Sequence, residues 1–292
     1  KKFIYYIFSH NRKLFKLWLF YARGVFLMNI DNYFYSEKHQ KVLYLVGDST
    51  VSSFHDSYYF PRYGYGTQLY RYFEGLNIIN LALPGRSSKS FIKETNYIFL
   101  EQNIKEGDFL IISFGHNDEK QDKLRYTNPV LSLEDTTSFK YYLYSFYIKL
   151  AIDHKAIPIL VTPIVRRNPF GIYTGSFIHC IEGTADYPGG DYSESIRSLG
   201  ELLKTTVIDL TQRTKDLYEK LDNVTTLKYH AWKTEDPESV DNTHLNVYGA
   251  SVVAYLFSQE IKNTDISLRN YLIPECVCPK EKDILFPNNN NT

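Results

Sequence analysis

Residues 41–50 read KVLYLVGDST, an unbroken apolar run that ends in a Gly-Asp-Ser-Thr turn. A strand with apolar side chains at every position is typical of a parallel sheet that is buried on both faces. Four further runs downstream have the same character, at residues 77–83 (NIINLAL), 108–114 (DFLIISF), 158–162 (PILVT) and 206–210 (TVIDL). The sequence therefore predicts five buried strands, the first of which ends in polar residues.

The segments between these strands have the amphipathic spacing of helices. We expect helices at 63–74, 88–102, 135–154, 193–204, 211–221 and 246–262. Strands that alternate with helices predict a single doubly wound α/β domain, a five-stranded parallel sheet of the flavodoxin-like kind flanked by helices, which we place at residues 41–265. The stretch 166–190, with five Gly and two Pro, has no regular pattern. A loop of that length within a compact domain is usually functional or disordered.

The two ends of the chain lie outside this pattern. Residues 1–40 form a basic and aromatic extension, and residues 266–292 form a C-terminal tail. No acid precedes Asp31, and the longest apolar run, 17–22, is far shorter than the roughly 20 residues of a membrane span. The extension also lacks the pattern of a signal peptide. It is either a basic helix on a membrane surface or a segment before a native start at Met28, the only methionine. We favour the start at Met28 and a cytoplasmic protein, with secretion as the alternative.

The composition excludes several classes of protein. The chain has 292 residues with 33 basic and 33 acidic side chains, so its net charge of zero gives no overall positive field for a nucleic acid. Three cysteines are too few for a disulfide scaffold. Cys180, Cys276 and Cys278 lack the further ligands that a metal site needs, so we interpret them as free thiols. We expect neither a metal nor an organic cofactor, because no HExxH, Walker A or dinucleotide-binding pattern occurs.

Polar residues follow the strands at the edge where open α/β sheets bind ligands. Ser49 lies on the tight turn after the first strand, where a hydroxyl is well placed as a nucleophile but needs a base. Gly85 lets a backbone N–H approach a ligand, and the amide of Asn117 can donate to an oxyanion. Asp241, three residues before His244, can hold the imidazole so that its other nitrogen acts as a base. Each feature alone is more often a turn, a helix cap or a structural histidine, but all of them fall at one edge of the predicted sheet.

Four short blocks carry these residues in chain order: GDST at 47–50, PGRSS at 84–88, GHND at 115–118 and DNTH at 241–244. With these blocks the sequence resembles the SGNH (GDSL-type) hydrolases. Within that superfamily it looks most like the rhamnogalacturonan acetylesterases, through RYGYGTQL at 62–69, NLALPGRSSKSF at 80–91, ILVTPIVRR at 159–167 and GDYSESIR at 190–197. The resemblance covers residues 41–262 with two departures. Tyr65 stands where a Trp is expected, and residues 223–240 match no feature of the family.

The resemblance implies the SGNH hydrolase fold and a serine esterase without cofactors. Ser49 is the expected nucleophile, His244 the base and Asp241 the residue that orients it. The N–H groups of Ser49 and Gly85 and the side chain of Asn117 form the expected oxyanion hole. The implied substrate and partner is an acetylated plant cell-wall polysaccharide or oligosaccharide of the rhamnogalacturonan (pectin) type. Two alternatives stay open: another acyl or lipid esterase of the GDSL type, and a catalytically silent carbohydrate-binding domain.

Three further side chains are candidates for binding an acidic sugar, namely Arg86, His116 and Arg167. Both arginines follow strands at the ligand edge, and arginine suits the planar carboxylates of galacturonate. A buried ion pair for Arg86 and an ordinary surface position for Arg167 are the alternatives. His116, together with Asp118, is expected first to brace the loop that holds Asn117, and contact with the sugar is the second possibility.

Overall fold

The computed structural model describes residues 40–54, 59–232 and 240–284. The predicted extension through residue 39, including Met28, lies outside the described residues, as do residues 285–292. Among the helices of the described segments, none combines the length and the apolar character needed to cross a membrane.

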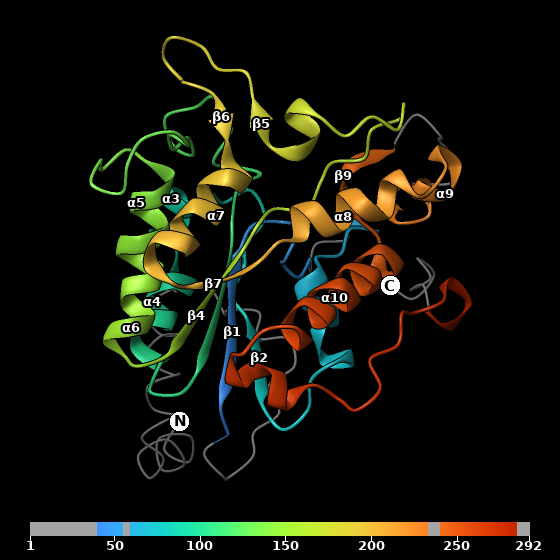
Figure 1. Ribbon diagram of the computed structural model, residues 1–292, viewed down its shortest axis with the longest axis horizontal. Coiled ribbons are helices and arrows are strands. Elements are labelled where there is room, and N and C mark those ends of the chain that lie inside the picture. The colour runs from blue at the N-terminus through green and yellow to red at the C-terminus, as the bar shows by residue number, and fades with distance from the viewer. Residues whose placement is uncertain (1–39, 55–58, 233–239, 285–292) are drawn as a thin grey trace, which may run out of the picture. The chain divides into compact units, whose positions relative to one another are not determined.

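A five-stranded parallel sheet forms the centre of the domain, as the sequence predicts (Figure 1). Its strands are β1 (Val42–Gly47), β2 (Asn77–Asn80), β3 (Phe109–Ser113), β4 (Ile157–Val161) and β7 (Thr206–Ile208). They lie in the flavodoxin-like order β2-β1-β3-β4-β7, and every neighbouring pair is parallel. The chain order reverses between β1 and β3, and ligands of such sheets bind beside that switch point. Here this is the edge where β1 and β3 end in the paired residues Gly47 and Ser113.

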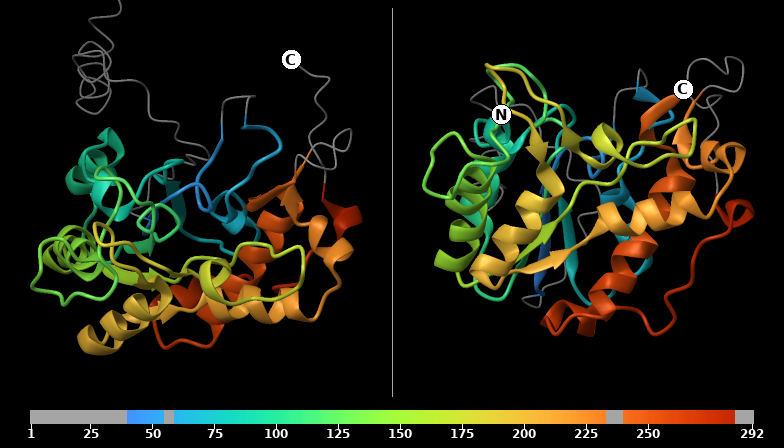
Figure 2. Two further views of the ribbon diagram at one scale, coloured as in Figure 1. Left: turned by 90° about the horizontal axis from the view of Figure 1, so that it is seen from above. Right: turned by 45° about the horizontal axis from the view of Figure 1, so that its top comes forward.

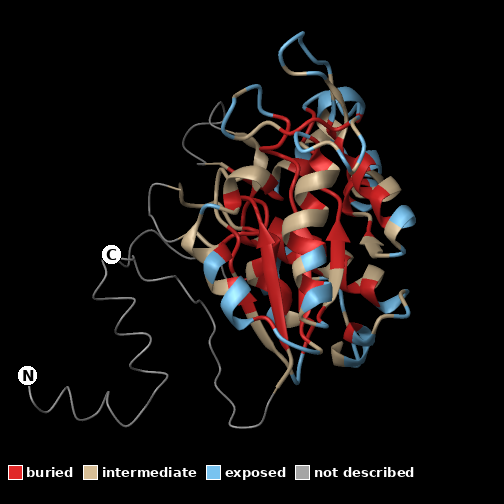
Figure 3. Cartoon of the chain, turned by 90° about the vertical axis from the view of Figure 1, so that its left-hand side faces the viewer, coloured by how far each residue is buried: buried red, intermediate tan, exposed pale blue. Residues whose placement is uncertain are grey.

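Side chains from both faces of the sheet form the core. Every residue of β1 and β3 is buried, which explains the unbroken apolar runs in the sequence (Figure 3). Leu43, Leu45 and Ile111 have no exposed surface. Full burial of such a side chain contributes roughly 1.5–3 kcal/mol relative to leaving it in water. The strands that end at the site are therefore fully buried in the core.

Helices cover both faces of the sheet (Figure 1). One face carries the 3₁₀ helix η2 (Tyr65–Arg71), α8 (Leu210–Glu219) and α10 (Val247–Lys262). The other face carries α3 (Ser88–Phe91), α4 (Thr95–Asn103), α5 (Phe139–Tyr142), the π-helical segment η3 (Leu143–Ile148), α6 (Lys149–Asp153) and α7 (Tyr192–Leu203). This two-sided cover confirms the doubly wound arrangement.

The first crossover differs from the helix predicted at 63–74, since only the short η2 forms there. Gly64 and Gly66 let this segment pack directly against the turn after β1. A Cβ atom on Gly64 would lie 2.2 Å from the carbonyl carbon of Val51, so no other residue fits at this contact. Tyr65, between the two glycines, is fully buried and stacks on Phe257. It therefore belongs to the core and offers no stacking surface to a ligand.

Two other predicted helices are divided or shortened. The helix expected at 88–102 is two helices, α3 and α4. The helix expected at 135–154 begins only at Phe139, where the hydroxyl of Ser138 caps it by accepting the N–H of Tyr141. Serine at this position satisfies a backbone donor that has no partner within the helix.

Two short antiparallel ladders lie at the carboxyl end of the sheet (Figure 1). One pairs β8 (His230–Ala231) with β9 (Asp241–Leu245), just after α9 (Asn223–Leu227). The other lies in the irregular stretch 166–190, where the 3₁₀ helix η4 (Gly175–Ile178) precedes the paired strands β5 (Cys180–Ile181) and β6 (Gly190–Asp191). Figure 2, in which this end comes forward, shows that the loops of the site gather there.

Residues 266–284, which we expected to form a tail, pack against the domain. The 3₁₀ helix η6 (Ser267–Tyr271) places Leu268 in the core without exposed surface. Leu272 forms a β-bridge with Phe73, and the N–H of Ile273 donates to Tyr72. A last 3₁₀ turn, η7, spans Glu281–Asp283. The packing of the domain therefore continues past residue 265.

Candidate active site

The turn after β1 presents Ser49 at the carboxyl edge of the sheet. Asp48 is buried, and its Oδ1 accepts hydrogen bonds from the N–H of Thr50 at 2.9 Å and from the Thr50 hydroxyl at 2.8 Å. Burial raises the pKa of Asp48, against the effect of these two hydrogen bonds. The N–H groups of Val51 and Ser52 both donate to the carbonyl of Asp48. This network fixes the backbone from which the Ser49 hydroxyl projects.

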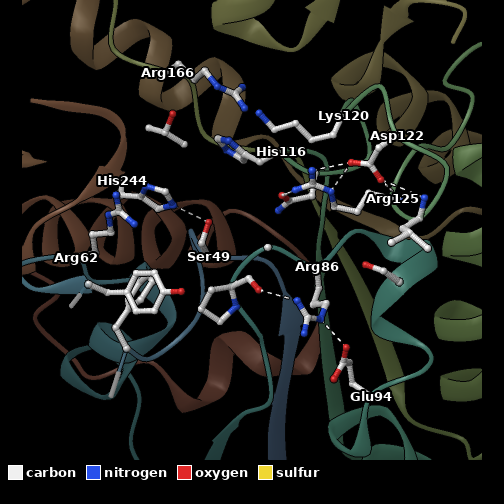
Figure 4. Close-up of a pocket in the computed structure, with 18 of the residues that line it drawn as sticks. Ser49, Arg62, Arg86, Glu94, His116, Lys120, Asp122, Arg125, Arg166 and His244 are labelled. Atoms are coloured by element: carbon white, nitrogen blue, oxygen red, sulfur yellow. Dashed lines mark hydrogen bonds and ion pairs between the residues drawn. The ribbon is translucent and has the colours of Figure 1, made fainter. Parts of the chain in front are cut away.

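Ser49, His244 and Asp241 lie in one hydrogen-bonded line. The Ser49 Oγ atom lies 2.9 Å from His244 Nε2 (Figure 4). On the other side of the ring, Nδ1 lies 2.7 Å from Asp241 Oδ2. The carboxylate accepts the Nδ1–H bond, so Nε2 is left to accept the proton of the hydroxyl. The three residues that the sequence singled out are thus within hydrogen-bond reach of one another.

Asp241 is held as a carboxylate by several donors. Its Oδ1 accepts the N–H groups of Thr243 at 3.0 Å and of His244 at 2.9 Å. Burial alone would raise the pKa of Asp241, but the hydrogen bonds from His244 and Thr243 hold it well below its usual range. Oδ2 also forms an ion pair with Nη2 of Arg62 at 2.9 Å. Sequence reasoning did not identify Arg62, because an arginine that meets the acid from a distant loop carries no local signal.

A second histidine, His230, supports the strand that carries Asp241 and His244. Its Nδ1 lies 3.0 Å from the carbonyl oxygen of Asp241 and 3.2 Å from that of His244. Its Nε2 lies 2.7 Å from the hydroxyl of Tyr218. Burial lowers the pKa of His230 to about 4, so the ring is neutral at pH 7, donates from Nδ1 and accepts at Nε2. His230 lies in the stretch 223–240, in which the sequence showed no recognisable feature.

The three expected oxyanion donors border the same cavity as His244. Gly85 has a φ of +74°, in the left-handed region that favours glycine. A Cβ atom there would meet no other atom within 4 Å, so the backbone of Gly85 is open toward the cavity. The Oδ1 atom of Asn117 accepts a bond from Nη1 of Arg125 at 3.4 Å. With Oδ1 bound in this way, the NH₂ group of Asn117 is available to a ligand.

Asp118 joins the loops that carry Gly85 and Asn117. Its carboxylate accepts hydrogen bonds from the N–H and hydroxyl of Ser88 and from the hydroxyl of Thr127 at 2.9 Å. Burial raises the pKa of Asp118 to about 7, despite these three bonds. The side chain is fully buried and braces both loops, whereas the sequence suggests this only for the loop that holds Asn117.

His116 borders the cavity but is almost completely buried. Within the described part of the chain, neither of its ring nitrogens has a hydrogen-bond partner. Its ring packs edge-on against that of His179, with the centroids 4.4 Å apart. Burial, reinforced by His179, lowers the pKa of His116 well below its ordinary value. Both ring nitrogens are buried in this structure, so contact between His116 and a ligand stays a prediction.

The two predicted arginines have different places. Arg86 borders the cavity and pairs with Glu94, so it both forms an ion pair and faces the ligand space. Arg167 does not line the cavity. Its buried guanidinium bonds to the Thr226 hydroxyl at 2.9 Å, to Asn242 Oδ1 at 2.9 Å and to the Asn223 carbonyl at 2.8 Å. The expectation that Arg167 binds substrate is therefore wrong in this structure.

The neighbouring arginine, Arg166, faces the cavity in place of Arg167. Consecutive side chains of an extended chain point in opposite directions, so one arginine of the pair faces the cavity and the other faces the protein. Arg166 Nη2 forms an ion pair with Glu119 Oε1 at 2.6 Å. Glu119 also lies 2.9 Å from Nδ1 of the buried His179. These contacts hold Arg166 at the upper wall of the cavity (Figure 4).

The cavity has a volume of about 910 Å³, and eight of its nineteen lining residues are charged (Figure 4). The cationic residues are Arg62, Arg86, Lys93, Lys120, Arg125 and Arg166. The acidic residues of the lining are Glu94 and Asp122. Phe54 and Tyr59 add aromatic surface beside His244. In the segments that the structure describes, no group of three His, Cys, Asp or Glu side chains is placed to hold a metal ion.

Known proteins are similar to this chain over most of its length. The profile of the GDSL-like lipase/acylhydrolase family matches residues 43–257. Rhamnogalacturonan acetylesterase RhgT of Bacillus subtilis (strain 168) is 30% identical over 240 residues, which cover 79% of this chain and 94% of that protein. The probable rhamnogalacturonan acetylesterase YesY of the same organism is 30% identical over 235 residues, or 80% of this chain and 98% of that protein.

A solved structure supports the fold. The YxiM protein of Bacillus subtilis superposes with a TM-score of 0.60 at 23% identity, covering 78% of this chain and 58% of that chain. The family match extends from the first strand through all four blocks that carry Ser49, Gly85, Asn117 and His244. The chain therefore belongs to the GDSL-like lipase/acylhydrolase family and is a carboxylic ester hydrolase.

Proposed function

We propose that this enzyme is a serine acetylesterase that removes acetyl groups from an acidic, pectin-type polysaccharide or oligosaccharide such as rhamnogalacturonan. The observation that carries the proposal is the lining of the cavity beside Ser49, which holds six cationic side chains and two acidic ones. Four of the cations, the arginines, each form an ion pair and still border the cavity, and Lys93 and Lys120 add further positive charge. Arginine and lysine bind carboxylates, and galacturonate supplies one carboxylate per residue. The names of the relatives RhgT and YesY point to the same substrate class.

The proposed reaction begins at Ser49. Its Oγ atom attacks the acetyl carbonyl carbon as its proton passes to His244 Nε2, 2.9 Å away. Asp241 keeps the ring oriented and stabilises the imidazolium that forms. The carbonyl oxygen becomes an oxyanion, which accepts hydrogen bonds from the N–H groups of Ser49 and Gly85 and from the side chain of Asn117.

The tetrahedral intermediate then breaks down. The bond to the sugar oxygen breaks, and His244 gives its proton to the leaving hydroxyl, which leaves an acetyl group on Ser49. A water molecule attacks the acetyl-enzyme while His244 takes its proton. Acetate leaves, and the proton returns to Ser49. Every proton in this cycle is carried by His244, and one water molecule is consumed.

The cavity provides different surfaces on the two sides of Ser49. Phe54 and Tyr59 lie on the side of His244, where an aromatic ring can stack on a sugar face. Arg86 and Arg125 lie on the other side of Ser49 from His244 (Figure 4). A chain that alternates neutral and acidic sugars fits this division better than a long alkyl chain, which has no charge to meet the cationic wall.

Acetate release tests the proposal. The wild type and Ser49→Ala are assayed on p-nitrophenyl acetate, p-nitrophenyl octanoate and acetylated rhamnogalacturonan oligosaccharides. Release from the acetyl ester and the oligosaccharide that depends on Ser49 supports the proposal. Preference for octanoate moves the function to lipid esters, and no release from any of the three favours a silent binding domain. Wild-type activity in Ser49→Ala would contradict the assignment of the nucleophile.

A further inference from the structure

Arg62 lies on the wall of the cavity and contacts Asp241, the acidic member of the hydrogen-bonded series Ser49, His244 and Asp241. Its Nη2 atom is 2.9 Å from Oδ2 of Asp241. The same oxygen lies 2.7 Å from Nδ1 of His244. One carboxylate oxygen thus serves both a permanent cation and the imidazole that acts as the base.

The backbone holds Arg62 in this position. The N–H of Tyr63 donates to the carbonyl of Leu245 at 2.8 Å, which ties the segment to β9 one residue after His244. The N–H of Arg62 donates to the carbonyl of Tyr59 at 2.8 Å, and the guanidinium carbon lies 5.6 Å from the centroid of the Tyr59 ring. Arg62 is therefore part of the same rigid unit as His244.

The ion pair with Asp241 leaves part of the Arg62 guanidinium accessible from the cavity. The Arg62 side chain is 32% exposed and lines the cavity together with Ser49 and His244 (Figure 4). A guanidinium has five N–H donors in a planar fork, and the ion pair with Asp241 is formed by Nη2. A carboxylate in the cavity can therefore bind a second edge of the same group.

We propose that Arg62 couples the binding of a substrate carboxylate to the strength of His244 as a base. The inference rests on the proposed function, because it needs an acetylated substrate that carries a carboxylate near the ester. In the empty site, the guanidinium of Arg62 and the imidazole of His244 share Oδ2 of Asp241, so the charge of Arg62 opposes the positive charge that His244 gains during the reaction. A carboxylate bound to Arg62 offsets that charge, and His244 then takes the Ser49 proton more readily. Arg62 is thus a positioning residue that acts through Asp241.

Other charged and titratable groups surround His244 and stay in place when Arg62 is changed. Asp48 in the turn after β1 and His116 in the loop after β3 both interact electrostatically with His244. His230 on β8 contacts the His244 carbonyl, and Arg166 after β4 lines the same cavity. Comparing wild type with a variant of Arg62 alone therefore isolates the effect of this guanidinium.

The first test is a comparison of two matched substrates in wild type and Arg62→Met, which removes the charge and keeps most of the length. The substrates are an acetylated galacturonoside with a free carboxylate and its methyl ester, which is neutral. We expect the wild type to favour the free acid about tenfold in kcat/KM, the scale of one charge-assisted hydrogen bond, and Arg62→Met to lose this preference.

The pH dependence separates coupling from ordinary binding. Arg62→Met removes the cation that shares Oδ2 of Asp241 with the imidazole. The acidic limb of the kcat/KM profile for neutral p-nitrophenyl acetate therefore moves to higher pH. A bound substrate carboxylate should act in the same direction, because it offsets the charge of Arg62. We therefore expect that, in the wild type, the acidic limb of the kcat profile lies at higher pH with the free-acid substrate than with its methyl ester. A purely structural role for Arg62 lowers activity without moving either limb.

Arg71→Met is the matched control. Arg71 belongs to η2, donates to Gln68 Oε1 and lies over the ring of Tyr70, and it does not line the cavity. This variant is expected to keep the wild-type preference for the free acid and the wild-type acidic limb of the pH profile. Arg62→Lys, which keeps the charge, should keep the limb. Arg62→Gln answers the same question if thermal unfolding shows that Arg62→Met does not fold.

The outcomes are distinguishable. If Arg62→Met folds and its pH profile has the same acidic limb as the wild type, the proposed coupling to His244 is overturned. If in that case the variant has also lost the preference for the free acid over the methyl ester, Arg62 is only a binding residue. Equal rates of the wild type on the acid and its methyl ester also overturn it. If the wild type cleaves p-nitrophenyl acetate but neither galacturonoside, the proposed function fails, and the limb in Arg62→Met still decides whether Arg62 acts on His244.

Discussion

Asp241 shows how much of the site depends on single side chains. Its two oxygens accept two backbone N–H groups, the imidazole Nδ1–H and the guanidinium of Arg62. These donors hold the carboxylate in its ionised form although it is partly buried. An ionised acceptor beside Nδ1 selects the tautomer of His244 in which Nε2 can take a proton.

Asp241→Asn is expected to reduce kcat on p-nitrophenyl acetate by about 10³–10⁴-fold. An amide of the same shape can present N–H in place of an acceptor and so favours the wrong tautomer of His244. Initial rates at pH 7 measure the loss. Asp191→Asn, which changes a helix cap outside the cavity, serves as the control and should keep the wild-type rate. An Asp241→Asn enzyme within tenfold of wild type would show that this carboxylate does not orient the base.

Asp118 predicts a pH dependence of stability. Its pKa in the folded protein is about 7, while that of an unfolded Asp is about 3.9. Between these values the folded chain holds a proton that the unfolded chain has lost, so the contribution of Asp118 to the free energy of unfolding falls as pH rises from about 4 to about 7. His230, whose pKa is lowered, changes the free energy of unfolding in the opposite direction. Its effect cancels when the wild type is compared with Asp118→Asn, because both proteins contain it.

The measurement is the difference in free energy of unfolding between wild type and Asp118→Asn, obtained from urea titrations across this pH range. Asparagine cannot lose a proton, so the wild type should lose stability relative to the variant as pH rises. A constant difference would mean that Asp118 is ionised throughout, with its three hydrogen bonds outweighing its burial.

At the scale of elements, the strands of the central sheet could be predicted from the sequence. The two short strands β8 and β9, which position His244, could not. β1 and β3 are apolar at every position because both faces are buried, and that signal is complete within the strand. β8 has two residues and β9 reads DNTHL, mostly half-buried, so neither shows a run or an alternation. Their pairing depends on His230 and its contact with Tyr218, which only the folded chain brings together.

The same limit explains the outcome for the binding residues. From the sequence we predicted Arg167 as the arginine after β4 that binds substrate, whereas Arg166 lines the cavity. Which of the two neighbours faces the cavity depends on the direction of the chain after the strand, which the sequence does not show. Arg62 and Arg125 gain their roles from partners that the fold supplies, Asp241 and Asn117. The blocks of the family could be recognised because their function depends on local turns.

The packing of η2 against the turn after β1 predicts the effect of Gly64→Ala. The new methyl group would lie 2.2–2.4 Å from backbone atoms of Val51 and Ser52, so the turn that carries Ser49 must move. We expect a loss of stability of about 2–3 kcal/mol, in the range of overpacked cores, and a fall in kcat. Thermal unfolding and the rate on p-nitrophenyl acetate measure the two effects.

Gly75→Ala separates this clash from the loss of a glycine. Gly75 has a φ of +74°, and a Cβ there would meet only the Tyr271 ring, at 3.7 Å. The substitution should cost about 1–2 kcal/mol through backbone strain and leave kcat unchanged. Equal losses of kcat in the two variants would rule out a link between η2 and the nucleophile turn.

At the scale of the whole molecule, the distribution of charge is more informative than its sum. The chain has no net charge, yet six cations line one cavity, so the sequence total concealed the feature that favours an acidic substrate. Dissolved salt should screen the attraction between these cations and an acidic ligand. The Debye length falls from about 10 Å at 0.1 M salt to about 3 Å at 1 M, so attraction of an acidic ligand weakens in that range.

We therefore expect kcat/KM on acetylated rhamnogalacturonan oligosaccharides to fall about tenfold between low and high sodium chloride, as electrostatic attraction is lost. The value for neutral p-nitrophenyl acetate should change little, and it is the internal control. The same assay with Arg166→Met should show a weaker salt dependence. Parallel salt curves for the two substrates would contradict a role of the cationic wall in binding.

Ser49 and His244 touch each other across 195 residues of sequence. During translation the chain leaves the ribosome from its N-terminus, and early segments begin to fold before later ones exist. The β1 strand and its serine turn are therefore complete while β9 is still to be synthesised. A nascent chain, or one broken before Asp241, exposes the hydroxyl without a partner to remove its proton. We therefore expect a chain that ends before Asp241 to hydrolyse p-nitrophenyl acetate far more slowly than the full chain does.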